Sequence, residues 1–323
     1  MKTAVSIIFL LASGFAFSQE NTSDYYADLR DRFALRFYGT TKHNKFEFIN
    51  HEADQRIVYN PNEQFNIGLG FHYKWMSLGI AFNPGFKNDD HIFGKTEKLD
   101  VQLNTYMRKW LFDGHFIFYK GFFRGETDDY KDLPNAASLV PRRPDITTFS
   151  FGFGGTHTFN HEKFSYKAAF SMNEWQKKSA GSFLLGGYFS LYSLEADSIL
   201  IPARVDSLFP RLSKIHNLGS LDLGLSFGYA HTFVLKEHYF ASLSVIPGIS
   251  LQYLATQAAN EPEPQGNGHL SSKTQLRLSL GYNSEKWYYG LLSVFDNLVL
   301  KNSEQTEFNY SFGNFKIFVG RRF

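Results

Sequence analysis

Apolar and polar residues alternate along most of this chain. The clearest example lies between Leu218 and Leu235, where Leu, Phe or Tyr occupies every second position from 221 to 229 and small or polar residues stand between them. Successive side chains of a β-strand point to opposite faces, so this segment is expected to be a strand with one apolar and one polar face. The same period of two predicts further strands at residues 29–39, 46–50, 65–75, 77–83, 99–108, 115–124, 148–159, 164–173, 182–194, 239–255, 275–282, 288–300 and 307–323.

The length of these segments separates two kinds of all-β protein. Strands of soluble sandwiches usually have about 5 or 6 residues, whereas a tilted strand that crosses a membrane needs about 9 to 11. Most of the predicted strands are at least that long, and their polar faces carry charged side chains that the core of a sandwich would exclude. The pattern therefore predicts a transmembrane antiparallel β-barrel of 12 to 14 strands. The range stays open because tight turns and long connections do not alternate regularly around residues 196–216.

Composition agrees with a wall that is apolar on one side only. The chain of 323 residues contains 35 Phe and 18 Tyr, yet its mean hydropathy is −0.29. A helical membrane protein would need runs of about 20 apolar residues, which the chain lacks after its N-terminal segment. The formal net charge of +2 and the absence of a Lys/Arg cluster argue against nucleic acid as a partner. Without Cys, the fold must be stabilised by pairing and packing.

The N-terminal residues have the pattern of a secretory signal peptide. Lys2 supplies a positive charge, residues 4–17 are mostly apolar, and a small-x-small cleavage site ends the run. We therefore expect a signal peptide at residues 1–18, a short periplasmic segment at 19–28 and the barrel at 29–323. The alternative, an uncleaved anchor, is disfavoured because the apolar run is short for a spanning helix.

The chain ends with an aromatic residue on an alternating segment. Phe323 is preceded at alternate positions by Val319, Ile317 and Phe315. The barrel-assembly machinery of the outer membrane reads a final strand of this kind as an insertion signal, so this machinery is an expected partner. Outer-membrane lipid and other envelope proteins are further expected partners. The expected location is the bacterial outer membrane.

Several short motifs resemble one family of exported bacterial proteins. They are Tyr59-Asn60-Pro61-Asn62, residues 68–75 (GLGFHYKW), Gly94-Lys95-Thr96, Tyr119-Lys120-Gly121-Phe122 and residues 176–182 (QKKSAGS). Together they are similar to the family catalogued as domain of unknown function 4421, over nearly all of the mature chain. The resemblance implies a barrel in the outer membrane. It implies no activity and no catalytic residues.

Charged residues on the polar faces are the candidate lumen residues. They are Arg30, Arg32, Arg36, Lys74, Asp100, Arg108, Lys167, Asp222 and Arg277. An excess of cations would favour anionic solutes in a pore, because rings of charge tune pore selectivity. Alternatively, these cations pair with carboxylates of the loops, prop the barrel and block it. No residue is assigned to catalysis, to a cofactor or to a metal.

Three other groups of residues could carry chemistry. The loop at 176–182 combines small residues with two Lys and could bind phosphate, although a solvated turn is the simpler interpretation. Residues 88–91 offer oxygen ligands for a cation without the spacing of a calcium loop. His157 and His231 lie on apolar faces, where a lipid-modifying enzyme would need its site, but no nucleophile accompanies them. A His in an interfacial aromatic belt is the simpler interpretation of both.

The expected function is a narrow channel for small polar or anionic solutes. Barrels of about 8 strands are filled by side chains and barrels of about 16 to 18 leave an open channel, so the expected barrel is intermediate. The loop at 125–145 is the expected constriction. Residues 205–215 have helix-like spacing, interrupted at Pro210, and could plug the lumen, lie at the membrane surface, dock a partner or form a plain ordered loop. The alternatives are a non-conducting structural or accessory barrel of an envelope complex, and a lipid-modifying enzyme.

Overall fold

The computed structural model describes residues 24–63, 65–73, 76–83, 90–125, 140–209, 212, 214–259, 263–301 and 306–323. The expected signal peptide and most of the segment after it lie outside these ranges. Within them, no helix is long and apolar enough to cross a membrane.

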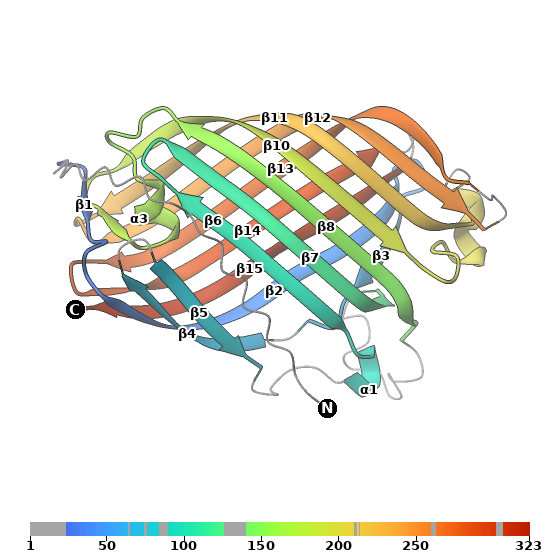
Figure 1. Ribbon diagram of the computed structural model, residues 1–323, viewed down its shortest axis with the longest axis horizontal. Coiled ribbons are helices and arrows are strands. Elements are labelled where there is room, and N and C mark those ends of the chain that lie inside the picture. Colours follow the sequence, from blue (N-terminus) through green and yellow to red (C-terminus); the bar gives the residue numbers. More distant parts are fainter. Residues whose placement is uncertain are drawn as a thin grey trace.

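The described residues form one antiparallel sheet of 13 strands, which lies within the predicted range. The strands are β2 (Ala34–Asn50), β3 (Gln55–Asn60), β4 (Phe65–Tyr73), β5 (Met76–Phe82), β6 (Glu97–Tyr106), β7 (Trp110–Arg124), β8 (Arg142–Thr158), β10 (Ala180–Glu195), β11 (Ile215–Leu235), β12 (Tyr239–Ala258), β13 (Gln265–Asn283), β14 (Trp287–Lys301) and β15 (Thr306–Arg322). Figure 1 shows them as long, steeply tilted ribbons around one axis. The two segments predicted at 29–39 and 46–50 are parts of the single strand β2.

The sheet closes through strands that lie far apart in the sequence. The last strand, β15, pairs with β2 along its whole length, and the end of β3 pairs with the end of β7. The closed path therefore runs over ten strands, namely β2, β3, β7, β8 and β10 to β15. The predicted transmembrane-type barrel is confirmed, with three of its 13 strands outside the closed path.

The two ends of the barrel differ in their connections. The turn end contains the C-terminus and the short connections at 236–238 and 284–286, and the loop end contains the longer connections at 196–214 and 259–264 (Figure 1). Outer-membrane barrels have short periplasmic turns and longer external loops. A barrel that follows this rule would have its turn end on the periplasmic side.

Strands β3 and β4 are two halves of one interrupted strand. β3 pairs with residues 46–50 of β2, and β4 pairs with residues 34–41 of β2. Pro61 lies at the interruption. Proline has no N–H to donate to a strand ladder, and at this position no ladder hydrogen bond is needed. β4 continues to β5, and β6 pairs with β7, but no pairing among the described residues joins β5 to β6. The wall is therefore closed at the loop end and has a seam between β5 and β6 toward the turn end.

The strand predicted at residues 164–173 is absent, and that prediction is wrong. The segment instead contains the short helix α3 (Tyr166–Phe170) and runs into β9 (Glu174–Gln176), which pairs with β1 (Tyr26–Asp28) in a separate small sheet. Ser165 caps the helix, because its hydroxyl accepts the N–H of Ala168 at 3.0 Å. Figure 1 shows α3 and β1 at the turn end of the barrel. The segment at 159–179 is therefore a plug between β8 and β10, which are adjacent in the sheet.

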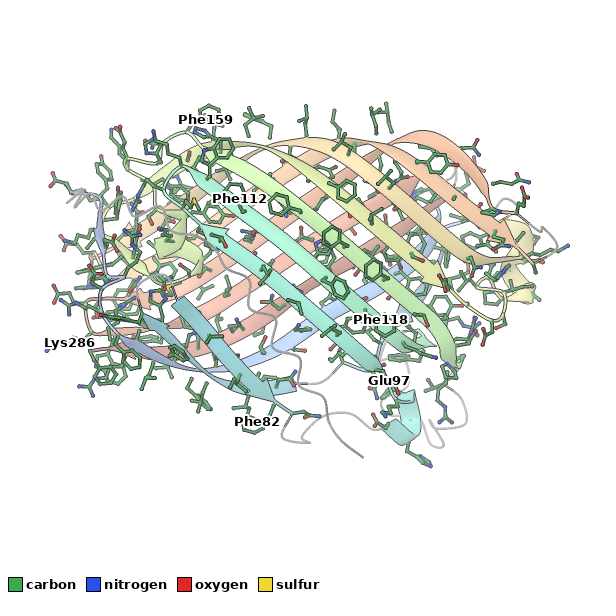
Figure 2. The ribbon with its side chains drawn as sticks, viewed as in Figure 1. Phe82, Glu97, Phe112, Phe118, Phe159 and Lys286 are labelled. Atoms are coloured by element: carbon green, nitrogen blue, oxygen red, sulfur yellow. The ribbon has the colours of Figure 1, made fainter. Side chains whose placement is uncertain are left out.

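The outer face of the wall is apolar, as the alternation predicted. On β11 and β12, Leu223 is 65% exposed and Ile249 70%, whereas Asp222 between its apolar neighbours is 0% exposed. Figure 2 shows Phe82 and Phe159 projecting from the outside of the ribbon. The buried residues therefore lie inside the barrel.

Candidate functional site

Three layers of side chains occupy the inside of the barrel. We name them the turn-end layer, around the plug at 159–179; the middle layer, around Arg277; and the loop-end layer, around Phe46 and Phe308. The candidate lumen residues are distributed among these layers and the turn-end rim.

The turn-end layer is built on a buried carboxylate. Glu174 is 0% exposed, and it accepts hydrogen bonds from Nη2 of Arg108 at 2.6 Å and from the hydroxyl of Ser165. Nζ of Lys167 lies 3.8 Å from the same carboxylate. Burial lowers the pKa of the Lys167 ammonium, and attraction to Glu174 opposes that shift. Two of the candidate lumen cations therefore hold the plug in place.

The motif at 176–182 also belongs to the plug. The side-chain oxygen of Gln176 accepts the N–H of Ser165 at 2.9 Å, and its Nε2 donates to three backbone carbonyl groups at 2.7 to 3.2 Å. Nζ of Lys177 lies 5.1 Å from the ring centre of Trp175, in a cation–π contact. The hydrogen bonds of Gln176 therefore hold β9 against the start of α3, and the ammonium group of Lys177 contacts the ring of Trp175.

Arg277 of β13 is the centre of the middle layer. It is 2% exposed, and its Nη2 lies 2.9 Å from Oδ2 of Asp113 on β7. Its Nη1 donates to the hydroxyl groups of Tyr106 at 2.9 Å and Tyr166 at 3.2 Å. Because Tyr166 belongs to α3, this guanidinium joins the plug to opposite parts of the wall.

Asp222 of β11 is held by neutral donors. Its carboxylate accepts from the hydroxyls of Ser220 and Ser250, each at 3.1 Å, and from Nε2 of Gln252 at 2.8 Å. These donors satisfy a carboxylate that is fully buried. Asp222 is therefore part of the packed interior.

Asp100 of β6 connects strands across the seam. Its Oδ1 forms an ion pair with Nζ of Lys42 on β2 at 2.8 Å, and its Oδ2 accepts a hydrogen bond from the hydroxyl of Tyr119 at 3.0 Å. On the same strand, Gln102 accepts from Nδ2 of Asn314 at 3.2 Å. Side chains, in place of a backbone ladder, thus link β6 to β2 and β15.

A small cavity lies within the middle layer. Its volume is about 40 Å³, and its lining includes His115, Lys273, Gln275 and Asp296. Lys273 and Gln275 both reach Asp296, at 3.7 and 2.7 Å. A space of this size holds no more than a few water molecules.

The loop-end layer is apolar and aromatic. Its buried members include Phe46, Phe48, Tyr59, Tyr192, Leu200, Phe209, Leu212, Leu300, Phe308 and Tyr310. The rings of Phe46 and Phe308 stack with centres 5.7 Å apart. The connection at 196–214 folds onto this layer, since Leu212 is fully buried and the 3-10 helix η2 (Ala203–Leu208) packs against it. Of the roles expected for residues 205–215, their position corresponds to covering the lumen.

Three of the five family-like motifs meet near the loop end, in one cluster of hydrogen bonds. The N–H of Asn62 donates to the hydroxyl of Thr96 at 2.8 Å, and its side-chain amide donates to the carbonyl of Gly94 at 2.7 Å. The Thr96 hydroxyl in turn donates to the carbonyl of Gly121 at 2.7 Å. Gly121 has a φ of +92°, which favours glycine. These motifs therefore position the chain where the wall is closed between β3 and β7.

The remaining candidate lumen residues lie elsewhere. Arg30 and Arg32 precede β2 at the rim, where they pair with Asp28 at 2.5 Å and with Glu285 at 3.6 Å, so they do not line the lumen as predicted. Arg36 of β2 faces inward. Lys74 lies outside the described residues.

Sequence reasoning missed several charged groups inside the barrel, among them Lys42, Lys273 and Asp296. Three more are instructive. Asp113 was placed before the expected start of its strand, Glu174 at the end of a segment taken for a strand, and Lys316 was not singled out. Lys316 does carry a signal, because it alternates with the outward Phe315 and Ile317.

The other candidates for chemistry also have simple placements. His157 lies between the rings of Trp110 and Phe159, each with its centre 5.0 Å away. His231 lies 4.3 Å from the ring centre of Phe233. Both have the surroundings of a His in an aromatic belt. Residues 88 and 89 lie outside the described ranges, and across those ranges no group of three or more His, Asp or Glu could hold a metal ion.

The chain is similar to solved outer-membrane barrels. The outer-membrane protease OmpT of Escherichia coli has 8% identity and a TM-score of 0.42, covering 92% of this chain and 98% of that chain. The toluene transporter TodX of Pseudomonas putida has 8% identity and a TM-score of 0.26, covering 91% and 90%. The outer membrane protein OprG of Pseudomonas aeruginosa has 10% identity and a TM-score of 0.24, covering 92% and 98%. At these identities nothing about activity follows.

The family comparison is more specific. No curated protein matches this sequence. The family model described as Domain of unknown function (DUF4421) matches residues 20–323, a range that includes every motif quoted above. The protein is therefore a member of the DUF4421 family, as the motifs predicted.

Proposed function

We propose that this protein is a closed, non-conducting barrel of the outer membrane that serves as a structural or accessory subunit in the envelope. The observation that carries the proposal is the filling of the lumen by three successive layers. The plug, the Arg277 network and the aromatic loop-end layer leave a cavity of about 40 Å³ in the middle of the barrel. A hydrated solute would have to displace buried ion pairs and packed rings to pass.

The channel expected from the sequence is the competing function. Its basis is an excess of inward cations, but three of the seven predicted cations have a carboxylate within 4 Å inside the barrel: Arg108 and Lys167 share Glu174, and Arg277 pairs with Asp113. A lumen with internally paired charges offers a passing anion little attraction. The second interpretation of the basic set, a propping network, fits these contacts better.

Larger hollows lie outside the lumen. Two open hollows of about 650 and 610 Å³ share Asp197 and His216 beneath the connection at 196–214. One is lined by residues of the outer face, among them Lys120 and Glu195. A protein partner at this rim would be in keeping with an accessory role.

Single-channel conductance of the refolded mature protein tests the proposal. Folding is first established by the heat-dependent shift of its electrophoretic band. The expected result is a folded barrel without open steps, together with stable partners that co-purify from the native membrane in mild detergent. Sustained open steps with anion preference would refute the proposal and restore the channel.

A further inference from the structure

Arg36 and Lys316 are inward cations without a carboxylate partner within the described part of the chain. Arg322, which also lacks one, donates instead to the backbone carbonyls of Ser284 and Met172 and to the side-chain oxygen of Asn283. Arg36 of β2 and Lys316 of β15 face the lumen, and neither has an acidic side chain within 4 Å, unlike Lys42, Lys273 and Arg277. Both lie against the ring of Tyr38, with Cζ of Arg36 5.8 Å and Nζ of Lys316 5.0 Å from its centre. Neighbouring cations that share one ring repel each other and are stabilised by an anion between or beside them.

Unpaired donors lie on and near Arg36. Nε of Arg36 and both ring nitrogens of His72 are buried without a hydrogen-bond partner. His72 lies on the inward face of β4, two positions from Gly70, which is the partner of Arg36 in the ladder. Buried polar atoms in proteins are almost always hydrogen-bonded, so this group of donors indicates a ligand rich in oxygen acceptors.

The wall beside these donors is made of small residues. The inward positions in the middle of β4 and β5 include Gly68, Gly70, Gly79 and Ala81. A Cβ on Gly68 would collide with the ring of Tyr38, and one on Gly79 would lie 2.9 Å from the Tyr38 hydroxyl oxygen. The ring of Tyr38 therefore lies flat across β4 and reaches β5, the strand at the seam.

The seam gives this group a lateral opening. No pairing among the described residues joins β5 to β6, and the inward residues Gly79 and Ala81 of β5 are exposed. On the outside, Ile80 of β5 is 78% exposed and Leu103 of β6 is 66% exposed. Figure 1 shows β4 and β5 as a pair set apart from β6 and β7 on the same side of the barrel. The rim of the seam is thus apolar outside and small or polar inside.

The depth of Arg36 matches a lipid headgroup, and Lys316, which lies opposite Thr40 further from the turn end, has its Nζ at the ring of Tyr38. Arg36 lies two residues after the first residue of β2, which corresponds to about 7 Å along a strand. With the turn end on the periplasmic side, this is the level of the headgroups of the inner leaflet. Aromatic residues that anchor barrels at the interface lie outside at the same end, including Trp287, which is 48% exposed, and Tyr289, which is 46% exposed.

We propose that Arg36, Lys316 and His72 form a binding site for the anionic headgroup of an amphiphile that lies across the seam between β5 and β6. Its phosphate or carboxylate oxygens accept from the three side chains over Tyr38, and its acyl chain lies against Ile80 and Leu103. The site does not depend on whether the barrel conducts, because it opens to the side of the wall.

Native mass spectrometry of the refolded protein in detergent tests the site. Dioleoyl phosphatidylglycerol is the anionic probe, dioleoyl phosphatidylcholine the zwitterionic control and inorganic phosphate the soluble anion. The expected result is retention of phosphatidylglycerol in preference to phosphatidylcholine, weakened about tenfold or more in the Arg36→Gln, Lys316→Gln double variant. The matched control, Lys236→Gln with Lys286→Gln, removes the same charge from exposed turns and is expected to retain binding.

A second variant tests the lateral route. Ala81→Trp places a large ring at the inner side of the seam without removing a charge, so it is expected to weaken phosphatidylglycerol binding. Equal retention of both lipids, or of phosphatidylglycerol by the double variant and the wild type, would overturn the site. Binding of inorganic phosphate without phosphatidylglycerol, or unchanged lipid binding in Ala81→Trp, would overturn the lateral amphiphile.

Discussion

The ion pair between Arg277 and Asp113 offers the sharpest test of the packed lumen. The guanidinium is 2% exposed, and Asp113 is its carboxylate partner at 2.9 Å. The Asp113→Asn substitution keeps the size and one acceptor of the side chain but removes its charge. Arg277 is then left charged and buried with neutral acceptors, chiefly the two Tyr hydroxyls.

The expected cost of this substitution is large for a single isosteric change. Removing one partner of a buried ion pair typically costs about 3 to 5 kcal/mol, because the remaining charge loses its compensation. The retained Asn acceptor offsets part of this, so we expect a loss of about 3 kcal/mol in the free energy of unfolding. This corresponds to roughly a 150-fold change in the unfolding equilibrium. Replacing Arg277 by Met in the same variant should recover part of it, since no charge is then left buried.

Equilibrium unfolding in urea, with the protein refolded into lipid vesicles and followed by Trp fluorescence, measures both effects. The control is Glu97→Gln, which removes the carboxylate partner of Lys95 in an exposed pair and should cost no more than about 1 kcal/mol. A cost for Asp113→Asn no larger than that of the control would refute the buried network. So would a double variant less stable than Asp113→Asn alone.

Three further predictions concern the plug, the closure of the wall and assembly. Glu174→Gln leaves the two cations around it without a carboxylate, so hydrogen exchange in residues 159–179 should become faster, and unchanged exchange would mean that other contacts hold the plug. Gly121→Ala introduces a Cβ at a φ of +92° against a backbone carbonyl and should cost about 1 to 3 kcal/mol by urea unfolding, whereas Gly268→Ala, with open space around it, should cost far less. Phe323→Ala should slow folding in vesicles that contain the assembly machinery while leaving the rate in plain lipid unchanged; equal slowing in both would assign Phe323 a structural role only.

The strands of the barrel wall could be predicted from the sequence because the alternation of apolar and polar residues is a local pattern. Each strand repeats its apolar residues with a period of two, and that period requires no knowledge of the neighbouring strand. The prediction failed at residues 164–173, where two periods compete. Tyr166, Ala168 and Phe170 alternate like a strand, but Tyr166, Ala169 and Phe170 also follow helical spacing, and Ser165 supplies the cap. Burial of both faces inside the lumen decides for the helix, and burial is a tertiary property.

The number of strands in the closed path could not be predicted from the alternation, because it depends on which strands pair with each other. The alternation in residues 65–75 and 77–83 predicts strands but not their partners. The path closes over ten strands because β3 leaves the line of β4 at Pro61 and reaches the end of β7. That contact depends on the hydrogen bonds of Asn62 with Gly94 and Thr96, which are far apart in the sequence.

Alternation predicts that a cation faces inward, but the contacts of that cation depend on the register between neighbouring strands. Alternation places Arg36 on an inner face, and it would place Lys316 there as well, but it does not say which charges meet. The pairing of β15 with β2 sets Lys316 opposite Thr40 and Gly320 opposite Arg36, so that both cations flank Tyr38. Lys42, Lys273 and Arg277 each meet a carboxylate of another strand, whereas Arg36 lies opposite Gly70 and Lys316 opposite Thr40. The glycines of β4 leave room for the ring of Tyr38 that both cations contact, and a member of this family that keeps both cations but fills the glycine positions would argue against a ligand there.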